Sequence, residues 1–241
     1  MNALRVQYLI KFSKKHSIRF IGHLDLLRTI QRMIKRSELP VEYSKGFNPH
    51  INMSIAQPLA VGVYSCGEYM DLYFEEEVLE DHIKEKLNKS APSGIEVLRV
   101  DKVKNVENKK VFKSMAEINA AKYIISIKYK DVSKLKENIE NLMKSPTWNT
   151  IKKTKKGEKE IDIKKLIKEL NYDVFENKLR IETVISCGSV ENLSPELLSN
   201  FIQDNTENAD KDCFIDIMRE EVYGRRQNKL LPLYEYVSDL Y

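Results

Sequence analysis

The sequence is poor in the residues that bind metals and form disulfides. Its 241 residues include only three cysteines and four histidines, and no two cysteines form a Cys-x-x-Cys pair. Cysteines that are few, far apart and odd in number are typical of reduced intracellular thiols rather than of a disulfide framework. Zinc sites need clustered ligands and iron–sulfur clusters need several thiolates. We therefore expect that this chain carries no metal and no cofactor of its own.

Long apolar runs are absent as well. A helix that spans a bilayer needs about 20 apolar residues, and no run approaches that length. The first residues, Met1–Arg5, lead into an alternating pattern without the apolar core of a signal peptide. These two absences predict a cytoplasmic protein with no membrane partner.

Motifs of catalytic sites are also missing. The sequence contains no Gly-x-Ser-x-Gly elbow, no phosphate-binding loop and no His-Glu-x-x-His pair. His23 stands near Asp25 and His50 stands near Asn48, so either histidine can be imagined as a general base or a nucleobase contact. The sequence provides no fixed partner for either of them. We expect that this chain alone is not an enzyme.

The residues that are present indicate a globular α+β chain. Hydrophobic residues make up 42% and charged residues 32%, which is enough for a large core and a well-solvated surface. Apolar residues alternate in four segments of the first 110 residues and recur at helical spacing in two. In chain order the predictions are a strand at Leu4–Phe12, a helix at His23–Ser37, strands at Ile51–Ile55 and Glu68–Phe74, a helix at Val78–Leu87 and a strand at Ile95–Val103. This order predicts a ferredoxin-like βαββαβ domain with an antiparallel sheet over residues 1–110.

Residues 111–241 repeat this order less clearly, so we predict two tandem ferredoxin-like domains joined near Lys109–Met115. Ser194 and Pro195 favour the start of a helix, as N-cap and first helical residue. Strands are predicted at Lys122–Lys130, Trp148–Lys153, Leu179–Ser186 and Phe214–Val222, and helices at Val132–Met143 and Ser194–Ile202. A lysine-rich insertion near 151–176, with a short helix at Ile163–Leu170, interrupts the second domain.

The loop Tyr43–His50 combines residues that a bland linker would not need. Gly46 frees the backbone, Pro49 fixes it, and Phe47 places an aromatic ring among small polar groups. This mixture favours a shaped contact surface, and a rigid loop packed on itself is the alternative. The predicted surface joins the loop to the first helix and consists of His23, Asp25, Arg28, Arg32, Tyr43, Ser44, Lys45, Gly46, Phe47, Asn48 and His50.

Basic residues gather at two places, although the net charge of +4 is too small to predict a polyanion partner by itself. Arg28, Arg32 and two neighbours share one face of the first helix, which suits phosphates or simply forms a solvated face. A second group, Lys152, Lys153, Lys155 and Lys156, forms a basic arm that can grip phosphates without reading sequence. Four tyrosines near the first sheet, at 43, 64, 69 and 73, can stack bases or pack in the core.

These residues carry a resemblance to a known family. The run Arg19–Asp25, the helix with its arginines, the loop Tyr43–His50 and the segment Leu59–Gly62 resemble the radical-SAM-associated domain family of unknown function. That family occurs fused to the carboxyl end of radical SAM, cobalamin-type proteins or as a separate chain. The resemblance is specific over about residues 3–105 and looser beyond them. It implies that the partner is a radical SAM protein, which would carry an iron–sulfur cluster and S-adenosylmethionine.

Together these observations predict a non-catalytic accessory module that binds a radical SAM enzyme and presents or clamps its substrate, for which RNA is our hypothesis. The family supplies no catalytic residue to transfer. The alternative is an RNA-binding or RNA-processing protein, because tandem ferredoxin-like domains also build CRISPR repeat-processing endonucleases. That alternative rests on analogy of fold.

Overall fold

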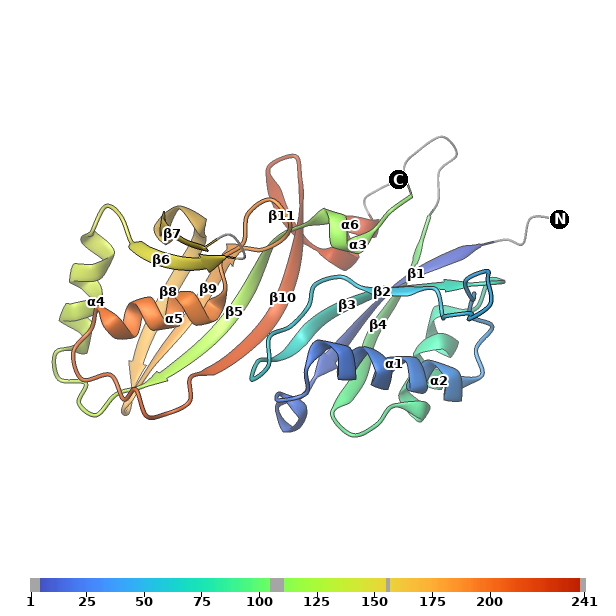
Figure 1. Cartoon of the computed structure of the whole chain (residues 1–241), viewed down its shortest axis with the longest axis horizontal. Helices are drawn as coiled ribbons and strands as arrows, with labels where there is room; N and C mark the ends of the chain where they lie inside the picture. Colours follow the sequence, from blue (N-terminus) through green and yellow to red (C-terminus); the bar gives the residue numbers. More distant parts are fainter. Residues whose placement is uncertain (1–4, 105–110, 155–156, 239–241) are drawn as a thin grey trace. The chain divides into compact units, whose positions relative to one another are not determined.

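The computed structural model describes residues 5–104, 111–154 and 157–238, which form a mixed α+β protein with mostly antiparallel strands (Figure 1). The chain divides into two compact units. The first unit combines Met1–Asn119 with Glu221–Tyr241, and the second is Ala120–Glu220. The C-terminal segment thus belongs with the first unit, whereas the sequence-based division placed it in the second. None of the helices in the described ranges is long and apolar enough to cross a membrane.

The sheet of the first unit is built around β1 (Val6–Lys14). This strand pairs antiparallel with β3 (Tyr64–Phe74) on one side and with β4 (Ile95–Val103) on the other. The short strand β2 (Met53–Ile55) pairs antiparallel with β3, so the strand order is β4-β1-β3-β2. The strand predicted at Ile95–Val103 is confirmed, and β3 begins earlier than the sequence pattern suggested.

Two helices, α1 (His23–Ser37) and α2 (Glu80–Ser90), pack against one face of this sheet. The predicted bounds of α1 are confirmed, because its apolar residues recur at three and four positions and bury one stripe. The core between the layers includes Tyr8, Ile10 and Phe12 of β1, and Leu26 and Ile30 of α1. Since side chains alternate along a strand, the intervening residues of β1 face the other side of the sheet.

The sequence patterns did not predict three short elements of the first unit. They are α3 (Ser114–Glu117), β11 (Lys229–Pro232) and α6 (Leu233–Ser238). The strand predicted at Phe214–Val222 is β10 (Asp216–Arg226), whose end from Glu221 onward belongs to the first unit. The strands β10 and β11 form a hairpin, in which Gln227 and Asn228 both take positive φ. A short 3-10 turn, η1 (His16–Ile18), links β1 toward α1.

A buried polar network ties the segment before α3 to the sheet. The carboxylate of Asp71 accepts hydrogen bonds from Gln7 Nε2 at 3.0 Å and from Ser114 Oγ at 2.7 Å. The backbone N–H of Ser114 donates to the same carboxylate at 3.1 Å, and Gln7 Nε2 also donates to the carbonyl of Phe112. These contacts fix the chain where it leaves the predicted first domain.

The described residues of the second unit form antiparallel strands and two α-helices. The strand β9 (Lys178–Ser186) lies between β5 (Ile118–Lys128) and β8 (Ile167–Phe175). The helices are α4 (Leu135–Lys144) and α5 (Pro195–Asp204). Between α4 and β8 stand the hairpin of β6 (Asn149–Thr154) with β7 (Gly157–Asp162) and the 3-10 turn η2 (Ile163–Leu166).

The short helix predicted at Ile163–Leu170 is wrong. Only η2 is helical, and the chain then continues as β8, which pairs with β9 along its length. The spacing of Ile163, Leu166 and Leu170 fits a helix, but Leu170, Tyr172 and Val174 also alternate as a strand does. Cross-strand pairing with β9 decides between the two patterns. The predicted insertion is thus a hairpin followed by a strand of the sheet.

Candidate binding surface

The loop Ser44–His50 is closed by its own hydrogen bonds. The N–H of Ser44 donates to the carbonyl of His50 at 2.8 Å, and the N–H of His50 donates to Ser44 Oγ at 3.0 Å. An isolated bridge between Tyr43 and Ile51 continues the closure at the base. The loop therefore has a defined shape although every residue from 43 to 50 is exposed.

Glu42 anchors the base of this loop to β3. Its N–H donates to the carbonyl of Tyr73 at 2.8 Å. Its carboxylate accepts a hydrogen bond from Asn52 Nδ2 at 2.6 Å and pairs with Arg5 Nε at 3.1 Å. Because Tyr73 stands next to the last residue of β3, the loop sits at that end of the strand.

The tip of the loop presents an aromatic ring to solvent. The relative exposure of Phe47 is 113%, so its ring packs against nothing else in the described chain. The neighbouring Gly46 has φ +135°, and a Cβ built on it would meet no atom within 4 Å. The chain thus uses a left-handed glycine to turn a loop that leaves Phe47 free, which is not how a loop packed on itself behaves.

A second part of the predicted surface lies at the start of α1. The ammonium group of the fully buried Lys14 donates to the carbonyls of Arg19 at 2.8 Å and Val63 at 3.2 Å. The N–H of Gly62 also donates to the carbonyl of Arg19 at 2.9 Å. These bonds hold the segment Leu59–Gly62 against the entry to α1. Two motifs of the family resemblance, far apart in sequence, are therefore neighbours in the structure.

The structure places these two parts at opposite ends of β3. The entry to α1 is tied to Val63, just before the first residue of β3, and the loop is tied to Tyr73 near its last. The helix α1 runs between them over 15 residues, about 22 Å. His23 and Asp25, at the start of α1, therefore lie far from the loop that carries Phe47. The predicted surface is two separate patches rather than one.

The basic side chains of α1 differ in whether they form ion pairs or hydrogen bonds within the protein. Arg28 Nη1 pairs with Asp25 Oδ1 at 3.2 Å, and Arg36 Nη2 donates to the carbonyl of Ser90 at 2.8 Å. Arg32 and Lys35 are exposed and form no ion pair within the described residues. These two side chains are the ones that α1 can offer to an outside anion.

His23 and His50 form no side-chain hydrogen bond with another described residue. Nδ1 of His23 is buried and forms no hydrogen bond with the described part of the chain. For His50 the hydrogen bonds are those of its backbone, and its side chain is exposed in the loop. Among the described residues, no group of three His, Cys, Asp or Glu side chains is placed to hold a metal ion.

The basic arm is a β-hairpin with mixed charge. Lys152 Nζ donates to the carbonyl of Asn192 at 2.7 Å, and Lys153 stands opposite Glu158 in the β6–β7 register. Lys155 and Lys156 lie outside the described residues. At most part of this arm is therefore available to phosphates, because Lys152 is already bound within the second unit.

Burial decides the role of two of the tyrosines. Tyr69 and Tyr73 have relative exposures of 1% and 7%, so both are packed within the protein and are not available to stack on a base. Tyr43 is 40% exposed, at the base of the loop that carries Phe47. The aromatic groups that this end of β3 offers to a ligand are therefore Tyr43 and Phe47.

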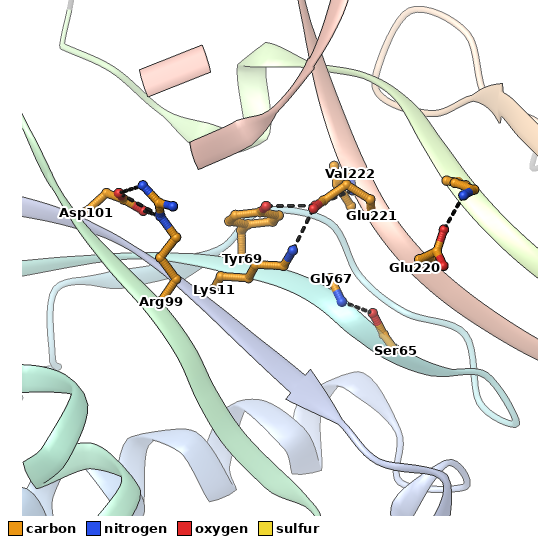
Figure 2. A network of polar contacts seen from close by, with 10 residues as sticks. Lys11, Ser65, Gly67, Tyr69, Arg99, Asp101, Glu220, Glu221 and Val222 are labelled. Atoms are coloured by element: carbon orange, nitrogen blue, oxygen red, sulfur yellow. Dashed lines mark hydrogen bonds and ion pairs between the residues drawn. The ribbon is translucent and has the colours of Figure 1, made fainter. Parts of the chain in front are cut away.

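The sequence did not indicate a polar cluster on the sheet face away from α1 and α2 (Figure 2). Lys11 Nζ pairs with Glu221 Oε2 at 2.6 Å, and Tyr69 Oη donates to Glu221 Oε1 at 2.7 Å. Burial and the neighbouring carboxylate of Glu221 raise the pKa of Tyr69 far above its usual value. The alternation of β1 placed Lys11 on this face, but nothing in the sequence linked it to a residue 210 positions away.

The fold and these surfaces describe an α+β chain with one projecting loop and a polar sheet face. Residues 7–195 match the model of a family described as "Uncharacterized protein conserved in bacteria (DUF2344)", and the chain belongs to this family. The match contains nothing that links the family to radical SAM proteins. No curated protein matches the sequence.

Three solved structures resemble the chain weakly. A chain of a Cbf5–Nop10–Gar1 complex has a TM-score of 0.49 at 10% identity, over 96% of this chain and 54% of that one. This protein thus spans about half the length of the chain it matches. An unknown protein from Galdieria sulphuraria has a TM-score of 0.26 at 12% identity, over 90% and 99% of the two chains. A putative glycine cleavage system transcriptional repressor has a TM-score of 0.22 at 8% identity, with the same coverage. None of these likenesses supports a function for this chain.

Proposed function

We propose that this protein is a non-catalytic accessory module that docks onto a partner protein through the loop Ser44–His50. The observation that carries the proposal is the full exposure of Phe47 at the tip of a hydrogen-bonded loop. The partner class is a radical SAM enzyme of the cytoplasm, which is what the family resemblance in the motifs implies. That enzyme would hold the iron–sulfur cluster and S-adenosylmethionine.

An ordered loop with an exposed aromatic tip has the properties of an interface anchor. Leaving a phenylalanine in water forfeits about 2 kcal/mol of burial free energy, and nothing within the described fold recovers it. The loop is closed at Ser44 and His50 and anchored through Glu42, so little conformational entropy is lost when a partner binds it. Aromatic anchors in desolvated pockets dominate many interfaces.

Substrate contact is the second part of the proposal, with RNA as the substrate class. Its support is Arg32 and Lys35, two exposed cations on one face of α1 without an ion pair in the described chain. Arginine and lysine supply the phosphate contacts of nucleic-acid-binding proteins. The lysines of the predicted basic arm would add to this affinity.

The fold part of the proposal is that both units follow the ferredoxin-like plan. In the first unit the elements run β1-α1-β2-β3-α2-β4 with strand order β4-β1-β3-β2. In the second unit, β5-α4-β8-β9-α5 leads to β10, with order β10-β5-β9-β8 and the hairpin β6–β7 as an insertion. The split βαβ plan would give these two strand orders, which supports this part of the proposal.

The experiment is a pull-down with the tagged full chain from an extract of its source cell, with and without ribonuclease. We expect a radical SAM protein in both conditions, and its loss when Phe47→Ala replaces the wild type. Phe175→Ala is the matched control, because Phe175 is 65% exposed in the second unit and should not affect capture. If the radical SAM protein is still captured by both the Phe47→Ala and the Phe175→Ala variants, docking through the loop is refuted.

The alternative, an RNA-processing enzyme, predicts a different result. Such an enzyme would bring down RNA without a radical SAM protein, and purified protein would cleave that RNA. His50→Ala or His23→Ala would then abolish cleavage while binding persists. An accessory module shows no turnover for either substitution to remove.

A further inference from the structure

Three side chains form a row across the polar face of the first unit's sheet. Lys11 of β1 stands opposite Tyr69 of β3 and opposite Arg99 of β4. All three therefore point to the side of the sheet away from α1 and α2. The row begins at the exposed Arg99, on the last strand of the order on that side, and ends at the buried Tyr69 (Figure 2).

An aromatic ring of α6 covers the open end of this row. The ring centroid of Tyr234 lies 4.4 Å from Arg99 Cζ and 5.3 Å from Lys11 Nζ. The guanidinium of Arg99 is held by Asp101, with Nε and Nη2 at 2.9 Å and 2.8 Å from Oδ1. The guanidinium of Arg99 is thus held in place, and the ring of Tyr234 lies over it.

The charges of the row are already balanced inside the protein. Asp101 neutralises Arg99 and Glu221 neutralises Lys11, at contacts of 2.8 Å and 2.6 Å. What Arg99 leaves available is therefore the flat face of its guanidinium group, and such a face attracts aromatic rings. A nucleobase can stack on an arginine plane at the place where the Tyr234 ring lies over Arg99. This chemistry favours a base over a phosphate.

We propose that this row is a binding site for one unpaired RNA base, and that Tyr234 occupies the site until the base displaces it. The proposal deepens the RNA part of the proposed function, since it names a second contact and its control. The side chain of Arg99 keeps 49% of its exposure beside Asp101, so the site opens to solvent along β4. The row that Tyr234 covers is the stacking platform of the site.

The remainder of α6 is fixed independently of Tyr234. Tyr236 Oη donates to Glu117 Oε2 at 2.6 Å, and Leu233 and Val237 are buried at 0% and 4% exposure. Tyr234 itself is only partly buried, and its side-chain hydrogen bond is to the neighbouring Glu235 of the same helix rather than to the sheet. Its ring can therefore be removed while the helix stays in place.

The test is fluorescence anisotropy of a labelled oligoadenylate bound to the purified full chain. Tyr234→Ala should increase the affinity about tenfold, because two cation–π contacts of ordinary strength no longer compete. Tyr234→Phe keeps the ring and should bind as the wild type does. Adding Arg99→Gln to Tyr234→Ala should abolish the gain, and an abasic oligomer of equal length should show none. Thermal melts check that each variant is folded.

Two results overturn this proposal. One is an affinity for oligoadenylate that Tyr234→Ala leaves unchanged in a folded protein. The other is a gain that the abasic oligomer shares or that survives Arg99→Gln. Arg32→Gln separates this failure from failure of the proposed function, because it weakens a phosphate contact on α1 and leaves the row intact. If Arg32→Gln weakens RNA binding and Tyr234→Ala has no effect, the phosphate contact of α1 is supported and the base-binding site is refuted.

Discussion

Asp71 is a buried carboxyl group of the first unit whose pKa the fold shifts. Burial raises the pKa of its carboxyl, and hydrogen bonds from Ser114 and Gln7 counteract this only in part. A raised pKa means that the folded state holds the proton more tightly than the unfolded chain does. The network that fixes the segment before α3 is thus sensitive to pH.

We expect the wild type to gain stability relative to Asp71→Asn as pH falls. The stabilisation that comes from the raised pKa of Asp71 is fully present below the pKa of the unfolded chain, about 3.9. It is lost as pH rises through the pKa of Asp71 in the folded protein. Urea unfolding of both proteins across this range measures the difference. Parallel pH curves for the two proteins would show that Asp71 titrates normally.

Lys14 is a second residue with a structural role that can be measured. Lys14→Met removes the donor to the carbonyls of Arg19 and Val63 and should cost about 2–4 kcal/mol of unfolding free energy. Lys15→Met is the control. Its ion pair with Glu96 is about half exposed, so its loss should cost less than about 1 kcal/mol. If chemical denaturation shows that both variants lose the same unfolding free energy, the hydrogen bonds of Lys14 do not stabilise the fold as proposed.

Sequence reasoning found the exposed residue types but not their partners. The loop with Gly46 and Phe47 stood out because its composition is unusual for a linker, and the structure leaves Phe47 exposed. From the sequence, Tyr69 could equally stack on a base or pack in the protein. The structure shows that it is buried and that its hydroxyl donates to Glu221 Oε1 at 2.7 Å. Contacts between distant strands have no signal in a single sequence.

At the level of elements, α5 tests how well local rules determine a boundary. Ser194 Oγ accepts a hydrogen bond from the N–H of Leu197 at 3.2 Å, and Pro195 follows as the first helical residue, so the predicted start is confirmed. Ser194→Ala should lower the unfolding free energy by about 1 kcal/mol. Ser194→Gly should lower the unfolding free energy by only a few tenths of a kcal/mol. If thermal melts show Ser194→Gly to be less stable than Ser194→Ala, Ser194 does not act as an N-cap.

The elements that sequence patterns missed are short or ambiguous. The helix α6 has six residues and β11 has four, too few for a period to be visible. The strand β8 continues an apolar pattern that begins as a helix, and its pairing with β9 resolves it. Helices with a full amphipathic stripe, such as α1, were placed correctly because their own residues bury that stripe.

For the whole molecule, the salt dependence of RNA affinity reports the number of phosphate contacts. Each contact to single-stranded RNA contributes about −0.7 to the slope of log affinity against log salt. If Arg32 meets a phosphate, Arg32→Gln should make the slope less steep by that amount. Glu38→Gln, at the C-cap of α1, is the control and should keep the slope. Identical slopes for wild type and Arg32→Gln would exclude this contact.

The division into two compact units does not follow the order of the sequence. The chain leaves the first unit after Asn119 and returns at Glu221, within the single strand β10. A linker search finds breaks in composition, and no such break occurs inside a strand. The contacts of Glu221 with Lys11 and Tyr69 show which unit that end of β10 joins.

The central claim is that the chain binds a radical SAM protein through Phe47. The most direct measurement is the affinity of the purified partner for wild type, Phe47→Ala and Phe175→Ala by titration calorimetry. We predict that Phe47→Ala weakens binding by at least about 1 kcal/mol, with melting temperatures and the Phe175→Ala affinity unchanged. Equal affinity of all three proteins for that partner would contradict the account.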